Sequence, residues 1–251
     1  MTITKGVIKE NRHRKDIYIV TAVGIMFILS FSGANMQLSV YGQPITAYAV
    51  LAPIVLGVLG FLAAAFSIIV SLGTIPNEYK RGTSHLVWVR AISQPRYHGG
   101  LMLGSVLSSL ATLAALYAGF AGFLFLKGGA GDLIRLPMAF MLSCLPVIAL
   151  SVLASVASIK LPAMAAGLLS FAVLIAGTAH PLLSTLANTL GGFGGSALRV
   201  ALNILPNLYT LHAQASNLLF GRALDIHSLM GGLLMIYGLA HLLFVLKKKE
   251  A

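Results

Sequence analysis

Long apolar stretches separated by short polar segments dominate the chain. From residue 17 to residue 77 there is no Asp, Glu, Lys or Arg, and only a polar patch at about 35–46 divides this interval. It holds two apolar segments of about 20 residues each, the length at which an α-helix crosses a bilayer. The later stretches are also unbroken and lack the alternating ~10-residue segments typical of a transmembrane β-barrel. The pattern predicts an all-α membrane protein.

We expect six transmembrane helices within a single membrane domain over residues 17–246. Their approximate bounds are 17–33, 45–74, 99–126, 136–158, 163–183 and 229–246. A basic N-terminal segment, residues 1–16, precedes the domain, and a short tail, residues 247–251, follows it. Five crossings with a re-entrant pair are the main alternative.

Composition and charge agree with a membrane location. The 251 residues are 58% hydrophobic and 9% charged, whereas a soluble domain is roughly 25% charged, and the mean hydropathy is +0.91. The net charge is +11, but the basic residues form short clusters between apolar stretches. This distribution follows the positive-inside rule and argues against nucleic-acid binding.

The six-helix layout divides the 17 Lys and Arg residues unequally between the two sides of the membrane. Four lie outside: Lys127, Arg135, Arg199 and Arg222. The other 13 lie inside: Lys5, Lys9, Arg12, Arg14, Lys15, Lys80, Arg81, Arg90, Arg96, Lys160, Lys247, Lys248 and Lys249. Since positive loops stay in the cytosol, both termini are expected there.

The outer region before the last helix, residues 184–228, is only mildly polar. Glycines at 191, 192, 194 and 195 are expected to break any helix there. Residues 197–220 then have helical amphipathic spacing, which Pro206 interrupts. We expect either a re-entrant element at the mouth of a pathway or an interfacial helix that only packs.

The inner segment over about 76–98 is expected to form an amphipathic helix at the membrane surface. Its weakly apolar face consists of Tyr79, Gly82, Leu86, Val89 and Ser93. One face of such a helix meets the membrane domain and the other a soluble partner. A solvated helix without a partner is the alternative.

The Glu78-x-x-x-Gly82-Thr83 pattern resembles the coupling-helix segment of ABC-2-type ABC transporter permeases. In that family the segment also lies between the second and third helices. Pro95 and Arg96 depart from the family pattern by coming about one turn late. By this resemblance, the residues that contact an ATPase subunit would be Glu78, Tyr79, Arg81, Gly82, Thr83, Leu86 and Arg90.

The resemblance implies a permease without enzymatic activity of its own. It would pair with a second permease copy or a paralogue, and each would rest on a nucleotide-binding ATPase subunit. ATP and Mg²⁺ would bind to that partner, because this sequence has no Gly-x-x-x-x-Gly-Lys-Ser/Thr motif. The expected location is the bacterial cytoplasmic membrane. The expected activity is export of a hydrophobic or amphipathic cargo: lipid-linked, drug-like or peptide.

The competing interpretation is an ATP-independent membrane protein, either a secondary transporter or a membrane-embedded enzyme. Both classes depend on ionisable groups at membrane depth. The predicted helices contain no acid beyond Asp16 at an edge, and His180 and His241 are the ionisable candidates in or near them. No cluster has metal-ligand spacing. Substrate-binding residues stay unassigned.

Overall fold

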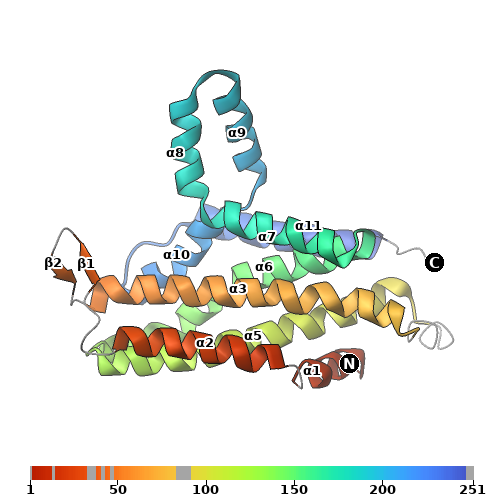
Figure 1. The fold of residues 1–251 in the computed structure, drawn as a ribbon, viewed down its shortest axis with the longest axis horizontal. Helices are drawn as coiled ribbons and strands as arrows, with labels where there is room; N and C mark the ends of the chain where they lie inside the picture. Colours follow the sequence, from red (N-terminus) through yellow and green to blue (C-terminus); the bar gives the residue numbers. More distant parts are fainter. Residues whose placement is uncertain are drawn as a thin grey trace.

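The fold is known from a computed structural model, which describes residues 2–12, 15–32, 38–40, 43–45, 48–82 and 92–246. These residues are almost entirely helical (Figure 1). In chain order the elements are α1 (Thr2–Arg12), α2 (Lys15–Ser32), β1 (Leu38–Val40), β2 (Gln43–Ile45), α3 (Tyr48–Lys80), α5 (Gln94–Leu126), η1 (Ala130–Arg135), α6 (Leu136–Lys160), α7 (Ala163–Thr178), α8 (His180–Leu190), α9 (Gly192–Ile204), α10 (Leu208–Leu219) and α11 (Ile226–Val245).

Several helices are long and apolar enough to cross a membrane. Four meet that description by themselves: Val50–Lys80, Gln94–Leu126, Ala130–Lys160 and Ile226–Leu243, with hydropathies of 2.6, 1.8, 2.3 and 1.5. The pair α7 and α8 counts as a fifth if it is one span bent by 74°. The chain therefore has the architecture of a multi-pass helical membrane protein.

The centre of the molecule is built by α3, which packs along both α5 and α6. Phe66, Phe120 and Phe123 are fully buried between these helices. Small hydroxyl residues let the helices approach closely, and the Ser71 and Ser151 Oγ atoms are 2.6 Å apart across α3 and α6. Figure 1 shows α2 beside this core and α7 and α11 on the opposite side.

The two ends of the bundle differ. Figure 1 shows α1 and the C-terminal end of α11 at one end, which we call the termini end, and β1 and β2 at the other, the hairpin end. β1 and β2 pair antiparallel as one short hairpin in the predicted outer turn, and the other described elements are helical. The helices α8 and α9 project sideways from the bundle as a pair.

The predicted inner helix over about 76–98 is wrong at both ends. Residues 76–80 continue α3 and residues 94–98 begin α5. Pro76 costs α3 one backbone hydrogen bond, but Ile75 beside it is completely buried and Tyr79 is bonded to α5, so the helix continues. Residues 83–91 lie outside the described residues.

Three further boundaries differ from the prediction. Lys15 and Asp16 belong to α2, so the N-terminal segment is shorter than 1–16. The predicted helix 163–183 divides after Thr178, because Pro181 occupies the first turn of a new helix rather than the interior of an old one. The glycine-rich stretch breaks the helix only at Gly191, and α9 begins at Gly192; both have φ above +50°. Pro206 does separate α9 from α10, as predicted.

Candidate functional sites

The predicted coupling residues that the structure describes lie at the termini end, where α3 stops. Glu78 and Tyr79 occupy its last turn, and Arg81 and Gly82 follow it. The Gly82 N–H donates to the Tyr79 carbonyl over 3.1 Å with φ at +70°, a backbone conformation that suits glycine. This turn directs the chain away from α3. Thr83, Leu86 and Arg90 lie outside the described residues.

Two side chains at the end of α3, those of Glu78 and Tyr79, are hydrogen-bonded to residues at the start of α5. The Tyr97 hydroxyl donates to Glu78 Oε2 over 2.7 Å, and the Tyr79 hydroxyl lies 2.9 Å from His98 Nε2. Gln94 Nε2 also donates to the Tyr79 hydroxyl over 2.8 Å. Tyr97 and His98 are almost fully buried. Both ends of segment 83–91 are thus held to one another through buried or half-buried polar contacts.

A third contact joins this region to α1. Arg81 Nη1 lies 2.7 Å from Glu10 Oε1, and both side chains are about half exposed, at 53% and 46%. Solvent weakens an exposed pair of this kind, so it adds little to the stability of α1. The helix itself is held by its contacts with α5, where Thr4 Oγ1 donates to the Gly100 carbonyl over 3.2 Å and Asn11 Nδ2 to Ser108 Oγ over 3.1 Å.

A cavity of about 260 Å³ lies beside these contacts. Its lining comes from α1 and α3: Val7, Glu10, Asn11, Gly73, Thr74, Asn77, Glu78 and Arg81. We call the hydrogen-bonded set Glu10, Glu78, Tyr79, Arg81, Gln94, Tyr97 and His98 the anchor cluster. Glu78, Tyr79 and Arg81 were predicted from the sequence, but the other four were not. The pattern that could have pointed to Tyr97 and His98 is their equal separation of 19 residues from Glu78 and Tyr79.

A second candidate site is a cavity of about 540 Å³ between α3, α7 and α10, which we call the α10 cavity. One wall is apolar and belongs to α3; the other carries polar groups of α10. The lining residues are Pro53, Ile54, Gly57, Val58, Phe61, Thr178, Tyr209, His212, Ala213, Ser216, Asn217 and Arg222.

His212 is the unusual residue of the α10 cavity. Its ring lies against Gly60 of α3, where an added Cβ would come within 2.6 Å of Nδ1. Nε2 is buried and has no hydrogen-bond partner among the described residues, a condition that costs about 1–3 kcal/mol. Burial lowers the pKa of His212 to about 4, so the imidazole is neutral at pH 7. His180 and His241, the histidines predicted from the sequence, are not among the residues that line this cavity.

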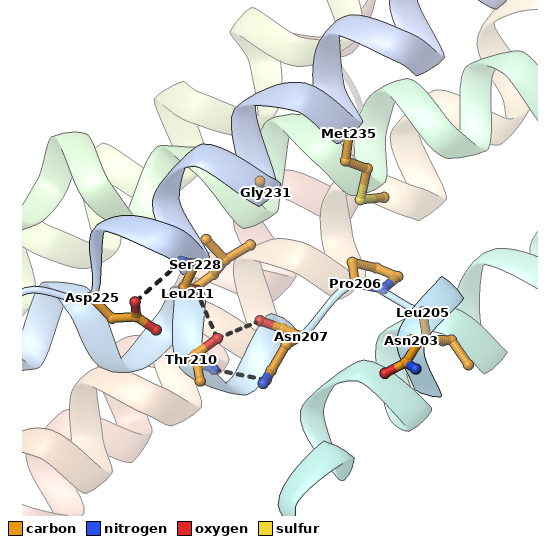
Figure 2. A pocket seen from close by; sticks show the side chains of 11 residues that line it. Asn203, Leu205, Pro206, Asn207, Thr210, Leu211, Asp225, Ser228, Gly231 and Met235 are labelled. Carbon is orange, nitrogen blue, oxygen red and sulfur yellow. Dashed lines mark hydrogen bonds between the residues drawn. The ribbon is translucent and has the colours of Figure 1, made fainter. Parts of the chain in front are cut away.

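A third cavity, of about 360 Å³, lies between α9, α10 and α11 (Figure 2). Its polar groups already serve the two helix N-termini. Asp225 Oδ1 accepts from the N–H groups of His227 and Ser228, and Asn207 Oδ1 accepts from the Thr210 N–H. The Thr210 and Ser228 hydroxyls lie 2.7 Å apart. Figure 2 shows the bond between the Thr210 and Ser228 side chains linking α10 to α11, so the hydrogen-bonded residues of this cavity have a structural use.

Fold and sites together define a class: a multi-pass helical membrane protein with a polar anchor cluster at one end and an amphipathic cavity within the bundle. Neither the family models nor the curated proteins compared with this chain match it. Within the described residues, no group of three His, Cys, Asp or Glu side chains has an arrangement that would hold a metal ion.

Proposed function

We propose that this chain is the transmembrane subunit of an ATP-driven ABC-2-type exporter, located in a bacterial cytoplasmic membrane. The observation that carries the proposal is the anchor cluster. Residues on both sides of segment 83–91, within the stretch over about 78–100 that resembles a coupling-helix segment, are joined to one another and to α1 by hydrogen bonds and an ion pair. A segment held in this way transmits a push from a soluble partner into three helices at once.

The helix layout supports six crossings by α2, α3, α5, α6, α7 and α11. α2 has 18 residues, which extend about 27 Å at 1.5 Å per residue, close to the ~30 Å of a hydrocarbon core. Its side chains Ile19, Met26 and Leu29 are well exposed, as lipid-facing residues are. An even number of crossings agrees with α1 and the end of α11 lying at the same end of the bundle.

The proposed assembly is a dimer of this chain, or of this chain and a paralogue, on two ATPase subunits. Hydrolysis of ATP with Mg²⁺ takes place on those partners. Closure of the ATPases pushes segment 83–91, and the anchor cluster passes the movement to α3, α5 and α1. The transported molecule is hydrophobic or amphipathic.

The test is site-specific photocrosslinking in native membranes. Benzoylphenylalanine replaces Lys80, which is exposed beside the anchor cluster, or Leu126, which is 68% exposed at the opposite end of α5. After mild solubilisation, each crosslinked product is identified by mass spectrometry and the purified complex is assayed for ATP hydrolysis. We expect a product with a P-loop ATPase from position 80 and none from position 126.

The proposal fails if position 80 yields no ATPase while the crosslinker is shown to be incorporated and reactive. The same result would favour an ATP-independent carrier or a membrane-embedded enzyme. Crosslinking of an ATPase equally from both positions would also count against it, because the contact would then not be specific to the anchor cluster.

A further inference from the structure

The α10 cavity has the features of a ligand site and has no part in the proposed coupling mechanism. It lies within one copy of the chain, and its volume of about 540 Å³ falls in the range typical of small-molecule sites, about 300–1,000 Å³. Ile54 and Tyr209 are 43% and 50% exposed at its edge, so the cavity opens to the surroundings.

The two walls differ in polarity. The α3 wall presents Ile54, Val58 and Phe61 at helical spacing on one face. The α10 wall presents the Tyr209 hydroxyl, the Asn217 amide and other polar groups along the same length. A wholly apolar ligand would leave these groups unpaired, and a wholly polar one would contact the apolar wall. The complementary ligand is amphipathic.

The charge at the mouth selects the sign of the headgroup. Within the described lining, Arg222 is the charged side chain and no carboxylate is present. A second guanidinium lies beside the same turn: Arg135 Nη1 donates to the Leu219 carbonyl over 3.4 Å and lies 3.0 Å from the position of a Cβ on Gly221. The nearest acid along the chain, Asp225, caps α11 with Oδ1.

We propose that the α10 cavity binds an anionic amphiphile, with its apolar chain against α3 and its acidic headgroup at Arg222. Asn217 and Tyr209 offer further hydrogen bonds to the headgroup. The interpretation of this ligand as transported cargo rests on the proposed function, whereas binding itself does not.

The test uses the purified full chain in lipid nanodiscs and three photoreactive probes with the same diazirine-bearing C18 tail: a carboxylic acid, an alcohol and an amine. Labelled peptides are mapped by mass spectrometry, with unlabelled oleate as competitor. We expect the acid to label residues of α3 and α10 that line the cavity, in a manner that oleate suppresses. The alcohol and the amine should label these peptides about fivefold less.

Two variants and one control make the assignment specific. Arg222→Gln should reduce labelling by the acid about fivefold and leave labelling by the alcohol unchanged. Gly57→Phe should reduce labelling by both, because a Cβ at Gly57 meets no atom within 4 Å and the ring extends into the cavity. Gly122→Phe, at an exposed position of α5 that is also open, is the matched control and should change neither.

Equal labelling by acid, alcohol and amine, or labelling that oleate does not suppress, would overturn the inference, since the cavity would then hold bulk lipid only. A labelled cavity in a chain that recruits no ATPase would support the site and overturn the proposed function. If the chain recruits an ATPase but oleate suppresses no labelling of the cavity, the proposed function is supported and the ligand site is overturned.

Discussion

Removing the Tyr97 hydroxyl tests the link between the anchor cluster and function most directly. In Tyr97→Phe the ring keeps its buried position, 2% exposed, but the 2.7 Å hydrogen bond to Glu78 is lost. Tyr117→Phe is a matched control in the same helix. Its ring is 5% exposed, and its hydroxyl bonds Ser143 and the Ala139 carbonyl away from segment 83–91.

The expected loss is of similar size in both variants. A hydrogen bond to a charged group contributes about 1.5–3 kcal/mol, and one between neutral groups about 0.5–1.5 kcal/mol. Glu78 is half-buried, so solvent screening places Tyr97→Phe at about 1–2 kcal/mol. Both substitutions should therefore lower the free energy of unfolding in detergent by about 1–2 kcal/mol.

Only Tyr97→Phe should affect coupling, because of the hydroxyl contacts removed in the two variants only the one to Glu78 joins α5 to a residue near segment 83–91. We expect faster amide hydrogen exchange in residues 78–98. We also expect a severalfold loss of that part of the ATPase activity of the purified complex for which this chain is required. Tyr117→Phe should leave both at the wild-type level. If the two variants reduce ATPase activity equally, the effect is one of global stability and the reasoning about the anchor cluster is wrong.

Three further predictions concern packing and pH. Gly104→Leu should displace α1 and cost about 1–3 kcal/mol of stability, because the new Cβ would lie 2.6 Å from Val7 Cβ. The rate at which a protease cleaves α1 measures the displacement. A rate equal to that of Gly122→Leu would contradict the prediction. Gly60→Ala should destabilise by a similar amount, since its Cβ would lie 2.6 Å from His212 Nδ1. Adding His212→Ala should recover part of that loss in a double-mutant cycle, and strict additivity would refute the contact. The third prediction follows from the low pKa of His212, about 4 in the fold against 6.5 as the ordinary value, because the unfolded chain takes up this proton at higher pH than the folded one. The free energy of unfolding is therefore highest above pH 6.5 and falls by up to about 3 kcal/mol as the pH drops toward 4. A plot of this free energy against pH should be flatter for His212→Asn than for the wild type. Identical slopes in the two plots would refute the assignment.

The helices were predictable where apolar length or a proline decides the structure. The stretch over residues 136–158 corresponds closely to α6, and Pro206 separates α9 from α10, because a proline inside a helix removes a donor and clashes with the preceding turn. Pro76 lies inside α3 without ending it. There α3 continues because Ile75 and Tyr79 pack against α5, a tertiary contact that local spacing does not reveal.

The candidate sites were predictable only in part. Glu78, Tyr79 and Arg81 were singled out by the resemblance of their segment to the coupling-helix segment of ABC-2-type permeases. Their partners Glu10, Tyr97 and His98 come from helices whose relative rotation the sequence leaves open. His212 was missed because it lies in a mildly polar stretch, and its ring packs against Gly60, about 150 residues earlier in the chain.

The sequence by itself determined that this is a helical membrane protein, because long uncharged apolar stretches have no stable place in water and must satisfy their backbone groups internally. It also determined the approximate positions of the long apolar helices, through length and charge. The tertiary structure decided which polar side chains meet. Hydrogen bonds such as Tyr97–Glu78 and an enclosed space such as the α10 cavity require several helices at one rotation and depth. Those quantities come from packing, to which residues distant in the chain contribute together.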